Sequence, residues 1–352
     1  MPDSLTTFAY QTFQQGKSIF SFTHKSLATA LINRLSPGVE GTQENPRMGE
    51  VIKDVRRSYD RIIQQDLEDV DQGIYPASLL FDNPWEDFFR FYPQVWLDMP
   101  RFWQRAKAGN FRDFSPNVDL AGYPNYYTQN FHYQTGGYLS EDSANLYDLQ
   151  VELLFFGAAD SMRRRVLAPL RKGLGKFADV EPKLVRVLDV ACGTGRTLRM
   201  LRGALPKASL YGVDLSPTYL RKANSDLSKL PGELPQLSQA NGEDLPYRDN
   251  YFHALSCVFL FHELPGPVRQ KVIDECFRVL QPGGTLVICD SIQLVDSPTL
   301  GPIMEGFSDS FHEPFYRDYM QDSLRDRMEK SGFEVVGEET HYMSKYVTGR
   351  KN

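Results

Sequence analysis

The chain has 352 residues, of which 41% are hydrophobic and 24% charged, and its formal net charge is −6. This balance is typical of a globular protein with a substantial core, and it argues against the overall basic surface of a nucleic-acid-binding protein. No run of 18 apolar residues and no signal-like hydrophobic segment occurs, so we expect no membrane-spanning helix.

The four cysteines form no CxxC pair, which argues against a zinc site, and a disulfide framework is unusual in a chain of this length. They are Cys192, Cys257, Cys276 and Cys289. Buried reduced thiols are the simplest interpretation and favour a cytoplasmic protein. An organellar or membrane-peripheral location stays open, because residues 4–39 contain no acidic residue and faintly resemble a transit peptide. We favour ordinary helices there, with at most weak peripheral contact with a membrane.

The first 143 residues have the pattern of helices joined by irregular segments. Proline, glycine and asparagine in residues 37–49 predict a loop, and apolar residues at helical spacing predict a helix over 51–70. Residues 83–109 contain all three tryptophans, and their prolines suggest short consecutive helices. The aromatic side chains there, Trp103 among them, suit a helical core, the wall of a substrate pocket, or both.

Residues 109–142 are polar, aromatic and rich in glycine, as in "GYPNYYTQNFHYQTGGYLSED" (122–142). Such a segment is too irregular for a long helix. Loops carry binding and catalytic residues more often than cores do, so we expect a lid or substrate loop here.

Beyond residue 143 the pattern becomes regular. A helix over 144–172 is followed by strands that alternate with helices, which predicts a parallel sheet covered on both faces. The final segment, 332–348, contains two strand-like halves and predicts an antiparallel last strand. We therefore divide the chain into a helical, aromatic-rich N-terminal region (1–143) and an α/β domain (144–352). The arginine triplet at 163–165 is interpreted as a solvated helix face.

The segment "VLDVACGTGRT" (187–197) predicts a strand that turns into a helix around a bound ligand. A dinucleotide site would place a third glycine or alanine where Leu198 stands, and the acid Asp189 would repel a pyrophosphate. Asp214 follows Gly195 by nineteen residues, at the end of the next strand, where a carboxylate can bind a ribose diol. A ligand with a ribose and an amine but no pyrophosphate fits, as S-adenosylmethionine does.

A third strand end contributes a polar loop. Asn241, Gly242 and Glu243 lie in "ANGEDLPYRDNYF" (240–252), where a polar side chain and backbone amides can bind the edge of an adenine.

Residues 144–352 resemble the class I S-adenosylmethionine-dependent methyltransferases, especially the ubiquinone/menaquinone-biosynthesis-like branch (methyltransferase type 11/25). The segments "VLDVACGTG", "LYGVDLS", "NGEDLPYRDNYFHAL", "FLFHEL" and "CFRVLQPGGTLVICD" match the motifs of that family in order and spacing. The resemblance implies a Rossmann-like, seven-stranded, mostly parallel sheet with helices on both faces and a reversed final hairpin. The first glycine of the family motif is Ala191 here.

The resemblance also implies a cofactor site. Asp189 and the glycines would hold the methionine end of the cofactor, Asp214 the ribose, and Asn241 and Gly242 the adenine. The full set of expected cofactor-binding residues is Asp189, Ala191, Cys192, Gly193, Gly195, Asp214, Leu215, Asn241, Gly242, Glu243 and Phe259.

Candidate catalytic groups follow from the chemistry of methyl transfer, which needs a base only where the acceptor must lose a proton. The candidates are His262, Glu263, His132 and Tyr138. A structural hydrogen bond is the favoured interpretation of His262, and surface positions are expected for His132, His253 and His312. No clustering of carboxylates is evident, so we expect no metal. The candidate substrate residues are His312, Tyr316, Trp103 and Tyr133, with Glu313 close by in sequence.

The sequence thus predicts transfer of a methyl group from S-adenosylmethionine to a small, apolar or aromatic acceptor such as a quinone, lipid or pigment, with S-adenosylhomocysteine as the product. Nucleic acid is not an expected partner, and the oligomeric state is left open. Three alternatives stand: a nucleotide-binding oxidoreductase, which Leu198 and Asp189 disfavour; a non-catalytic protein that binds the cofactor; and a methyltransferase that acts on a protein.

Overall fold

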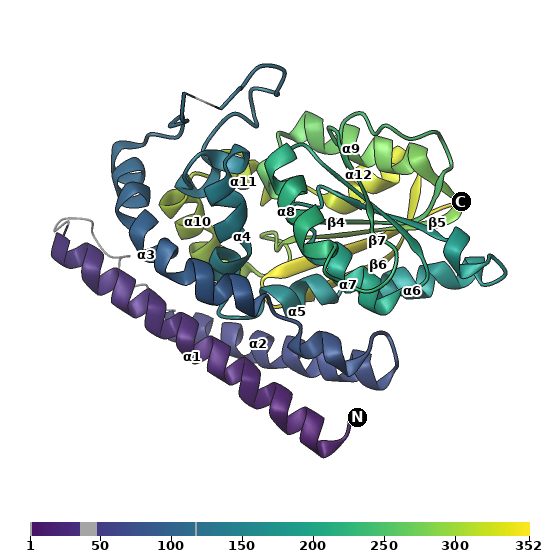
Figure 1. Cartoon of the computed structure of the whole chain (residues 1–352), viewed down its shortest axis with the longest axis horizontal. Coiled ribbons are helices and arrows are strands. Elements are labelled where there is room, and N and C mark those ends of the chain that lie inside the picture. The colour runs from purple at the N-terminus through teal and green to yellow at the C-terminus, as the bar shows by residue number, and fades with distance from the viewer. Residues whose placement is uncertain (1, 36–47, 117) are drawn as a thin grey trace.

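The computed structural model describes residues 2–35, 48–116 and 118–352, and most of the loop predicted over 37–49 lies outside them. A seven-stranded sheet with the order β3-β2-β1-β4-β5-β7-β6 forms the centre of the molecule (Figure 1). Strand β7 is antiparallel to both β5 and β6, and the other neighbours are parallel. The predicted seven-stranded sheet with a reversed final hairpin is confirmed. The strands are β1 (Arg186–Val190), β2 (Ser209–Asp214), β3 (Gln236–Gln239), β4 (Phe252–Val258), β5 (Leu280–Ser291), β6 (Phe333–His341) and β7 (Ser344–Lys351).

The central strands are apolar on both faces because helices cover both sides. Val187, Ala254 and Val287 face one hydrophobic cluster, and the next residue of each strand faces the other. Helices α6 (Leu167–Leu174), α7 (Arg196–Ala204) and α8 (Pro217–Leu227) contribute to the first cluster, whereas α9 (Gly266–Val279) and α12 (Leu324–Ser331) contribute to the second. Two further helices, α10 (Gly301–Ser310) and α11 (Tyr316–Tyr319), follow β5.

The single helix predicted over 144–172 is divided into three, and this expectation was wrong. Helix α4 (Glu141–Leu154) ends before Phe156 and Gly157, which both have positive φ, and α5 (Ala159–Arg164) and α6 follow. A Cβ on Gly157 would lie 2.6 Å from the Lys17 side chain, so the interruption makes room for the N-terminal helix.

The N-terminal region consists of three long helices that lie against the α/β part of the chain (Figure 1). They are α1 (Ser4–Leu35), α2 (Met48–Asp71) and α3 (Trp85–Ala108). Helix α3 runs through Pro93 and Pro100 without a break, so the expected series of short helices was wrong. Its buried side chains Phe91 and Val95 keep the helix packed although each proline removes a backbone donor.

The core continues across residue 143. Tyr10, Ile62 and Leu67 belong to the same hydrophobic cluster as Met162 and Leu170. The N-terminal helices therefore share a hydrophobic cluster with the α/β part of the chain, and the division at residue 143 stays a prediction.

Two residues of the arginine triplet at 163–165 anchor this contact, because Arg164 pairs with Asp66 and Arg165 with Asp69, both of α2. The prediction of the triplet as a solvated face was wrong. Arg164 is 1% exposed and donates from Nη2 to Asp66 Oδ2 at 2.6 Å and from Nε to Asp66 Oδ1 at 3.1 Å. Tyr10 and Tyr75 also donate to the Asp66 carboxylate. Acidic partners on α2 explain the burial, because a charge is tolerated in a core only when it is paired.

All four cysteines are buried and free, as predicted. Among the helices in the described ranges, none is long and apolar enough to cross a membrane.

Candidate active site

A pocket lies at the carboxyl ends of β1, β2, β3 and β4, where open parallel sheets bind their ligands. The loop after β1 supplies one wall, and Ala191, Gly193 and Gly195 of this loop all have positive φ. Glycine adopts that conformation freely, whereas alanine is strained in it. The φ of +57° at Ala191 therefore explains why a glycine suits this position of the motif better.

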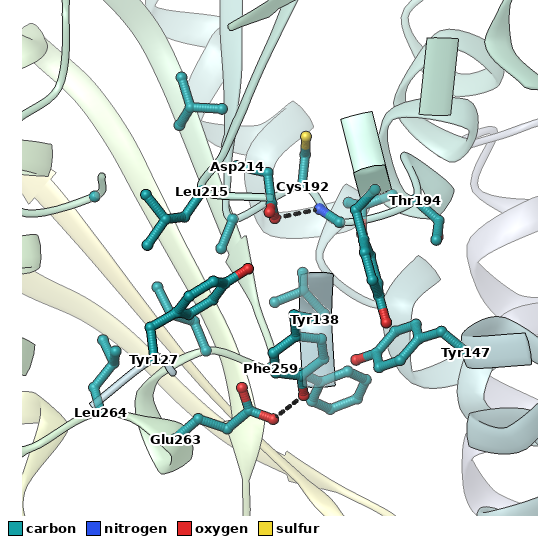
Figure 2. A pocket seen from close by; sticks show the side chains of 18 of the residues that line it. Tyr127, Tyr138, Tyr147, Cys192, Thr194, Asp214, Leu215, Phe259, Glu263 and Leu264 are labelled. Atoms are coloured by element: carbon teal, nitrogen blue, oxygen red, sulfur yellow. Dashed lines mark hydrogen bonds between the residues drawn. The ribbon is translucent and has the colours of Figure 1, made fainter. Parts of the chain in front are cut away.

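Gly193 and Asp214 form the edge of the pocket next to β2. The backbone N–H of Gly193 donates to Asp214 Oδ2 at 2.8 Å (Figure 2). The backbone N–H of Ser216 donates to Asp214 Oδ1 at 2.8 Å. A Cβ on Gly193 would meet only Tyr219 within 4 Å, at 3.9 Å, so open space lies above this glycine. Burial raises the pKa of Asp214 to about 6. A carboxylate fixed by backbone donors beside an open backbone surface fits the ribose and methionine portions of S-adenosylmethionine.

Helix α7, which follows the glycine loop, packs closely on β2. In the dinucleotide motif a small residue on the helix permits such packing, whereas here the small residue is on the strand. Leu198 of α7 is fully buried, and a Cβ on Gly212 of β2 would lie 2.7 Å from its Cδ1. The glycine that permits close packing of helix and strand is thus on the strand rather than on the helix.

Asp189, the acid of the loop motif, lies beneath the loop and is not among the residues that line the pocket. Its Oδ1 accepts a hydrogen bond from the Ser256 hydroxyl at 2.6 Å, and burial raises its pKa to about 7. The side chain of Asp189 thus lies outside the pocket lining, and its contact with the methionine end of the cofactor stays a prediction.

The loop after β3 adds Asn241 and Gly242 to the wall, as expected, but not Glu243. Glu243 accepts hydrogen bonds from Tyr126 at 2.6 Å and from Lys271 at 3.1 Å, and its backbone N–H donates to Asn241 Oδ1 at 3.0 Å. It shapes the loop that carries Asn241.

Of the other expected cofactor residues, Cys192, Leu215 and Phe259 line the pocket with Ala191 and Gly193, whereas Gly195 does not. Phe259 follows β4 with a φ of +58° and stacks on Phe155, the residue directly after α4, at a centroid distance of 6.0 Å.

Tyrosines cover much of the pocket. Tyr126, Tyr127 and Tyr138 come from the predicted lid segment, and Tyr147 and Tyr219 come from α4 and α8. In Figure 2, Tyr127 and Tyr138 lie between Asp214 and Glu263. The lid is held to three strand-end loops: Ser216 donates to the backbone oxygen of Tyr138 at 2.6 Å, Tyr126 donates to Glu243, and Tyr138 donates to Glu263. The tryptophans of α3 do not line the pocket, since Trp85 packs on Phe13 and Trp96 on His24, both of α1.

Two charged residues of the pocket wall were not predicted from the sequence: Asp148 of α4 and Arg163 of α5. Asp148 lines the pocket, and its Oδ2 accepts a hydrogen bond from Thr194 at 2.7 Å, while its buried Oδ1 has no hydrogen-bond partner among the described residues. Arg163, also in the wall, lies 3.7 Å from this oxygen. The signal was weak, because one acid within a helical pattern resembles any solvated position.

At the end of the pocket opposite Asp214, candidate catalytic residues that are distant in sequence lie close together. Glu263 lines the pocket, and its Oε1 lies 3.8 Å from His132 Nε2 and 3.9 Å from His262 Nε2. Glu313 forms an ion pair with His132. The expectation that His132 lies at the surface was therefore wrong. The expectation that carboxylates do not cluster was also wrong, because Glu263 and Glu313 lie together beside His132. The cause is the lid, which folds His132 over the loop after β4.

The electrostatics of this end are dominated by burial and by Asp290. Burial disfavours the charged form of His262, but Asp290, whose Oδ1 lies 2.6 Å from Nδ1, outweighs it and raises the pKa of His262 to about 10. Burial raises the pKa of Glu263 to about 7. The predicted structural hydrogen bond of His262 is present, and the side chain also faces the cluster.

The predicted substrate residues do not line the pocket. His312 stacks on Phe111 at 4.3 Å and contacts Gln129 through Nε2 at 2.7 Å. The Tyr316 hydroxyl lies 2.8 Å from Ser291 Oγ, Tyr133 packs near Phe102, and Trp103 is half-buried on α3.

His253 was expected to face solvent, and this was wrong. It is 4% exposed, and its Nδ1 accepts the backbone N–H of Arg186 at 2.9 Å, because β4 is a central strand.

Comparison with known proteins agrees with this geometry. Residues 187–284 match the family model described as a methyltransferase domain. The chain carries a class I S-adenosylmethionine-dependent methyltransferase domain.

Among relatives of this methyltransferase domain, a demethylmenaquinone methyltransferase of Thermus thermophilus is 34% identical over 145 residues, 41% of this chain and 60% of that protein. A ubiquinone/menaquinone biosynthesis C-methyltransferase of Desulfotalea psychrophila is 30% identical over 148 residues, 42% of this chain and 54% of that protein. The chain therefore spans less than two thirds of each of these curated relatives. A solved methyltransferase of Aquifex aeolicus is 23% identical, with a TM-score of 0.38, and covers 51% of this chain and 88% of its own.

Proposed function

We propose that the protein transfers a methyl group from S-adenosylmethionine to a small acceptor with an apolar or aromatic body. The observation that supports this most strongly is one pocket with two kinds of wall. Strand-end loops with Asp214, Gly193 and Asn241 suit the cofactor, while tyrosines and Glu263 lie beyond them. The relatives named for quinone biosynthesis favour a quinone-like or phenolic acceptor.

In this proposal the chain mainly positions two reactants. Asp214 accepts hydrogen bonds from the ribose hydroxyls, and the loop after β3 holds the adenine through Asn241 and Gly242. Asp148 and Arg163 are opposite charges in the wall that suit the α-ammonium and α-carboxylate of the methionine end. The bound cofactor supplies a methyl carbon activated by the sulfonium, and holding an acceptor in line with it contributes about 7–11 kcal/mol to lowering the barrier.

We further propose that the polar groups at the far end hold the acceptor. Tyr138, Glu263, His132 and His262 are the candidates, and Tyr127, Tyr147 and Phe259 supply apolar surface. His312, Tyr316, Tyr133 and Trp103 are more distant and would act by supporting the lid and its surroundings.

The test is formation of S-adenosylhomocysteine from S-adenosylmethionine with a panel of hydroquinones and phenols, beside a panel of proteins. We expect turnover with the small aromatic acceptors and none with the proteins. Cofactor binding by calorimetry without turnover on either panel would favour a non-catalytic protein, and turnover on proteins alone would overturn the proposed acceptor class.

Asp148→Asn should weaken cofactor binding at least tenfold, whereas substitution of the exposed Asp179 by Asn should leave it unchanged.

We also propose weak peripheral contact between α1 and an anionic membrane surface. Leu5, Phe8, Ile19 and Phe22 are spaced by 3 or 11 residues, which places them on one side of the helix, and each is at least 64% exposed. Helix α1 contains no acidic residue. Flotation with anionic vesicles should exceed that with neutral ones and fall in a Phe8→Ser, Phe22→Ser variant. Equal flotation of the original chain and the variant would contradict membrane contact. A dimer of the original chain that is lost in the variant would also contradict it, because the exposed face of α1 would then bind a second copy of the chain.

A further inference from the structure

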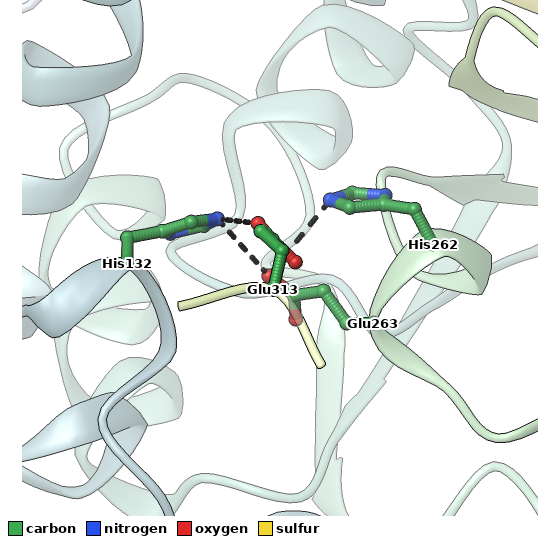
Figure 3. Close-up of side chains that lie close together, drawn as sticks. All are labelled: His132, His262, Glu263 and Glu313. Carbon is green, nitrogen blue, oxygen red and sulfur yellow. Dashed lines mark ion pairs between the residues drawn. The ribbon is translucent and has the colours of Figure 1, made fainter. Parts of the chain in front are cut away.

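Four side chains with metal-ligating atoms converge at the Glu263 end of the pocket (Figure 3). They are His132, His262, Glu263 and Glu313, and one donor atom from each lies within 4.8 Å of the others. Donors about 2.1 Å from one ion lie roughly 3–4 Å apart, so a small contraction of this cluster would enclose an ion. The ligands come from three distant segments: the lid, the loop after β4 and the stretch between α10 and α11.

Glu313 provides an independent indication that something is bound. Its side chain is 0% exposed, and apart from the contact of Oε1 with His132 neither carboxylate oxygen has a hydrogen-bonding partner in the described parts of the chain. Its contact is an ion pair with His132. A buried carboxylate that has one histidine as its partner and leaves its second oxygen without a hydrogen bond is costly, and a cation among the cluster would compensate for it.

His262 is oriented as metal-binding histidines are. Its Nδ1 lies 2.6 Å from Asp290 Oδ1, and the other Asp290 oxygen accepts backbone N–H groups of Leu260 at 3.0 Å and Phe261 at 2.6 Å. This carboxylate therefore fixes the ring so that Nε2 faces Glu263 and the cluster. An imidazole held by a carboxylate on one nitrogen and free on the other is the usual second-sphere arrangement at a metal.

The charge balance points the same way. Glu263, Glu313 and Asp290 are three buried carboxylates. Within residues 2–35, 48–116 and 118–352, their ion pairs are made with histidines, without a lysine or arginine. A divalent ion would neutralise the two glutamates and leave both histidines neutral, as ligation requires.

We propose that His132, His262, Glu263 and Glu313 bind a divalent first-row transition metal ion. Two imidazole nitrogens and two carboxylates suit Zn²⁺, Fe²⁺, Co²⁺ or Mn²⁺ better than Ca²⁺ or Mg²⁺, which prefer oxygen ligands. Tyr138, which donates to Glu263, and Asp290 are positioning residues of this site.

The site would serve the acceptor, and this step rests on the proposed function. Glu263 belongs both to the cluster and to the pocket wall, so an ion held there adjoins the acceptor end. An oxygen of a phenol or hydroquinone that bound the ion would lose its proton more easily, and the resulting oxyanion is the better nucleophile for a methyl group.

The test is binding of Co²⁺ and Zn²⁺ to the full chain after treatment with a chelator, without cofactor or acceptor. We expect one ion per chain by calorimetry and elemental analysis, and a visible absorption spectrum with Co²⁺. Glu313→Gln and His132→Ala should each weaken binding at least tenfold and remove the spectrum. Glu141→Gln, at an exposed position, is the matched control.

Circular dichroism checks that each variant folds, and calorimetry with S-adenosylmethionine checks that it binds the cofactor. Failure of the metal site can therefore be distinguished from failure of the proposed function. A metal-free chain that binds the cofactor but takes up no ion would overturn the metal site and leave the proposed function intact. Equal ion binding by Glu313→Gln and the original chain would also overturn it. If Glu313→Gln fails to fold, Glu313→Asp, which retains the ligand type, should recover both the fold and the spectrum.

Discussion

The Asp214 end of the pocket and the Glu263 end differ in how the chain supplies their polar groups. At the Asp214 end, short loops that each follow one strand bring Gly193, Asp214 and Asn241 together through the order of the sheet alone. At the Glu263 end, a lid from the N-terminal region and a segment after α10 must fold onto the loop after β4. The first end is thus a property of the sheet, whereas the second depends on packing between distant parts of the chain.

The largest expected effect concerns the anchor that joins these parts. Arg164→Met removes one partner of the buried pair with Asp66, and we expect the free energy of unfolding to fall by about 3–5 kcal/mol, because the Asp66 charge is left unpaired. Urea denaturation measures it. Arg221→Met, at a 62% exposed side chain, should change stability by less than about 0.5 kcal/mol. A similarly small loss for Arg164→Met would show that the N-terminal helices do not depend on this pair.

Removal of Asp214 tests the sheet-built end. Asp214→Ala should weaken S-adenosylmethionine binding by about 1.5–3 kcal/mol, the contribution of hydrogen bonds to a charged group. Calorimetry measures the affinity, with Asp179→Ala at an exposed position as the control. Unchanged affinity in a folded variant would refute the ribose assignment.

The pH dependence of cofactor binding follows from the same residue. Because the pKa of Asp214 is raised to about 6, its charged form is lost as the pH falls from 7 to 5, and affinity should fall by up to about tenfold. The raised pKa of Asp214 also stabilises the folded protein without cofactor at low pH. This contribution is fully present below pH 3.8, the ordinary pKa of an aspartate, and it is lost as the pH rises through about 6. Weaker binding at pH 5 is therefore not a sign of unfolding through this group. Asp214→Asn should bind weakly and without this dependence.

Tyr138→Phe separates the two ends. It removes the hydroxyl that donates to Glu263 but keeps the ring over the pocket, so we expect a loss of stability of about 0.5–1.5 kcal/mol and unchanged cofactor affinity. Thermal denaturation and calorimetry measure the two quantities. A cofactor affinity that fell as much as in Asp214→Ala would mean that the ends are not separable.

The smallest effect is expected in the glycine loop. Ala191→Gly relieves a residue held at a φ of +57°, which costs about 1–2 kcal/mol, but glycine loses more chain entropy on folding. The net gain in stability should be at most about 1 kcal/mol by urea denaturation. A loss would show that the methyl group of Ala191 contributes packing that outweighs the strain.

The contrast between the ends also explains what the sequence could predict. The strand order, the reversed hairpin and the placing of Gly193, Asp214 and Asn241 follow from local patterns, because each pattern contains its own strand and loop. Asp148, the burial of Arg164 and the meeting of His132 with Glu313 could not be predicted in this way. The Thr194 partner of Asp148 is 46 residues away in sequence, the Asp66 partner of Arg164 is 98 residues away, and Glu313 is farther still from His132. Local sequence periodicity carries no information about such distant partners. Asp189 shows the opposite limit, since a motif identified the residue but not which way its side chain turns.

The fastening of the lid has a kinetic consequence. Tyr126, the backbone of Tyr138 and the hydroxyl of Tyr138 are bonded to the loops after β3, β2 and β4, respectively. If the used cofactor leaves past this segment, all three bonds must break in one opening event, and turnover would be limited by departure of the product rather than by transfer of the methyl group. A rapid first turnover followed by a slower steady rate would be the signature of such a latch.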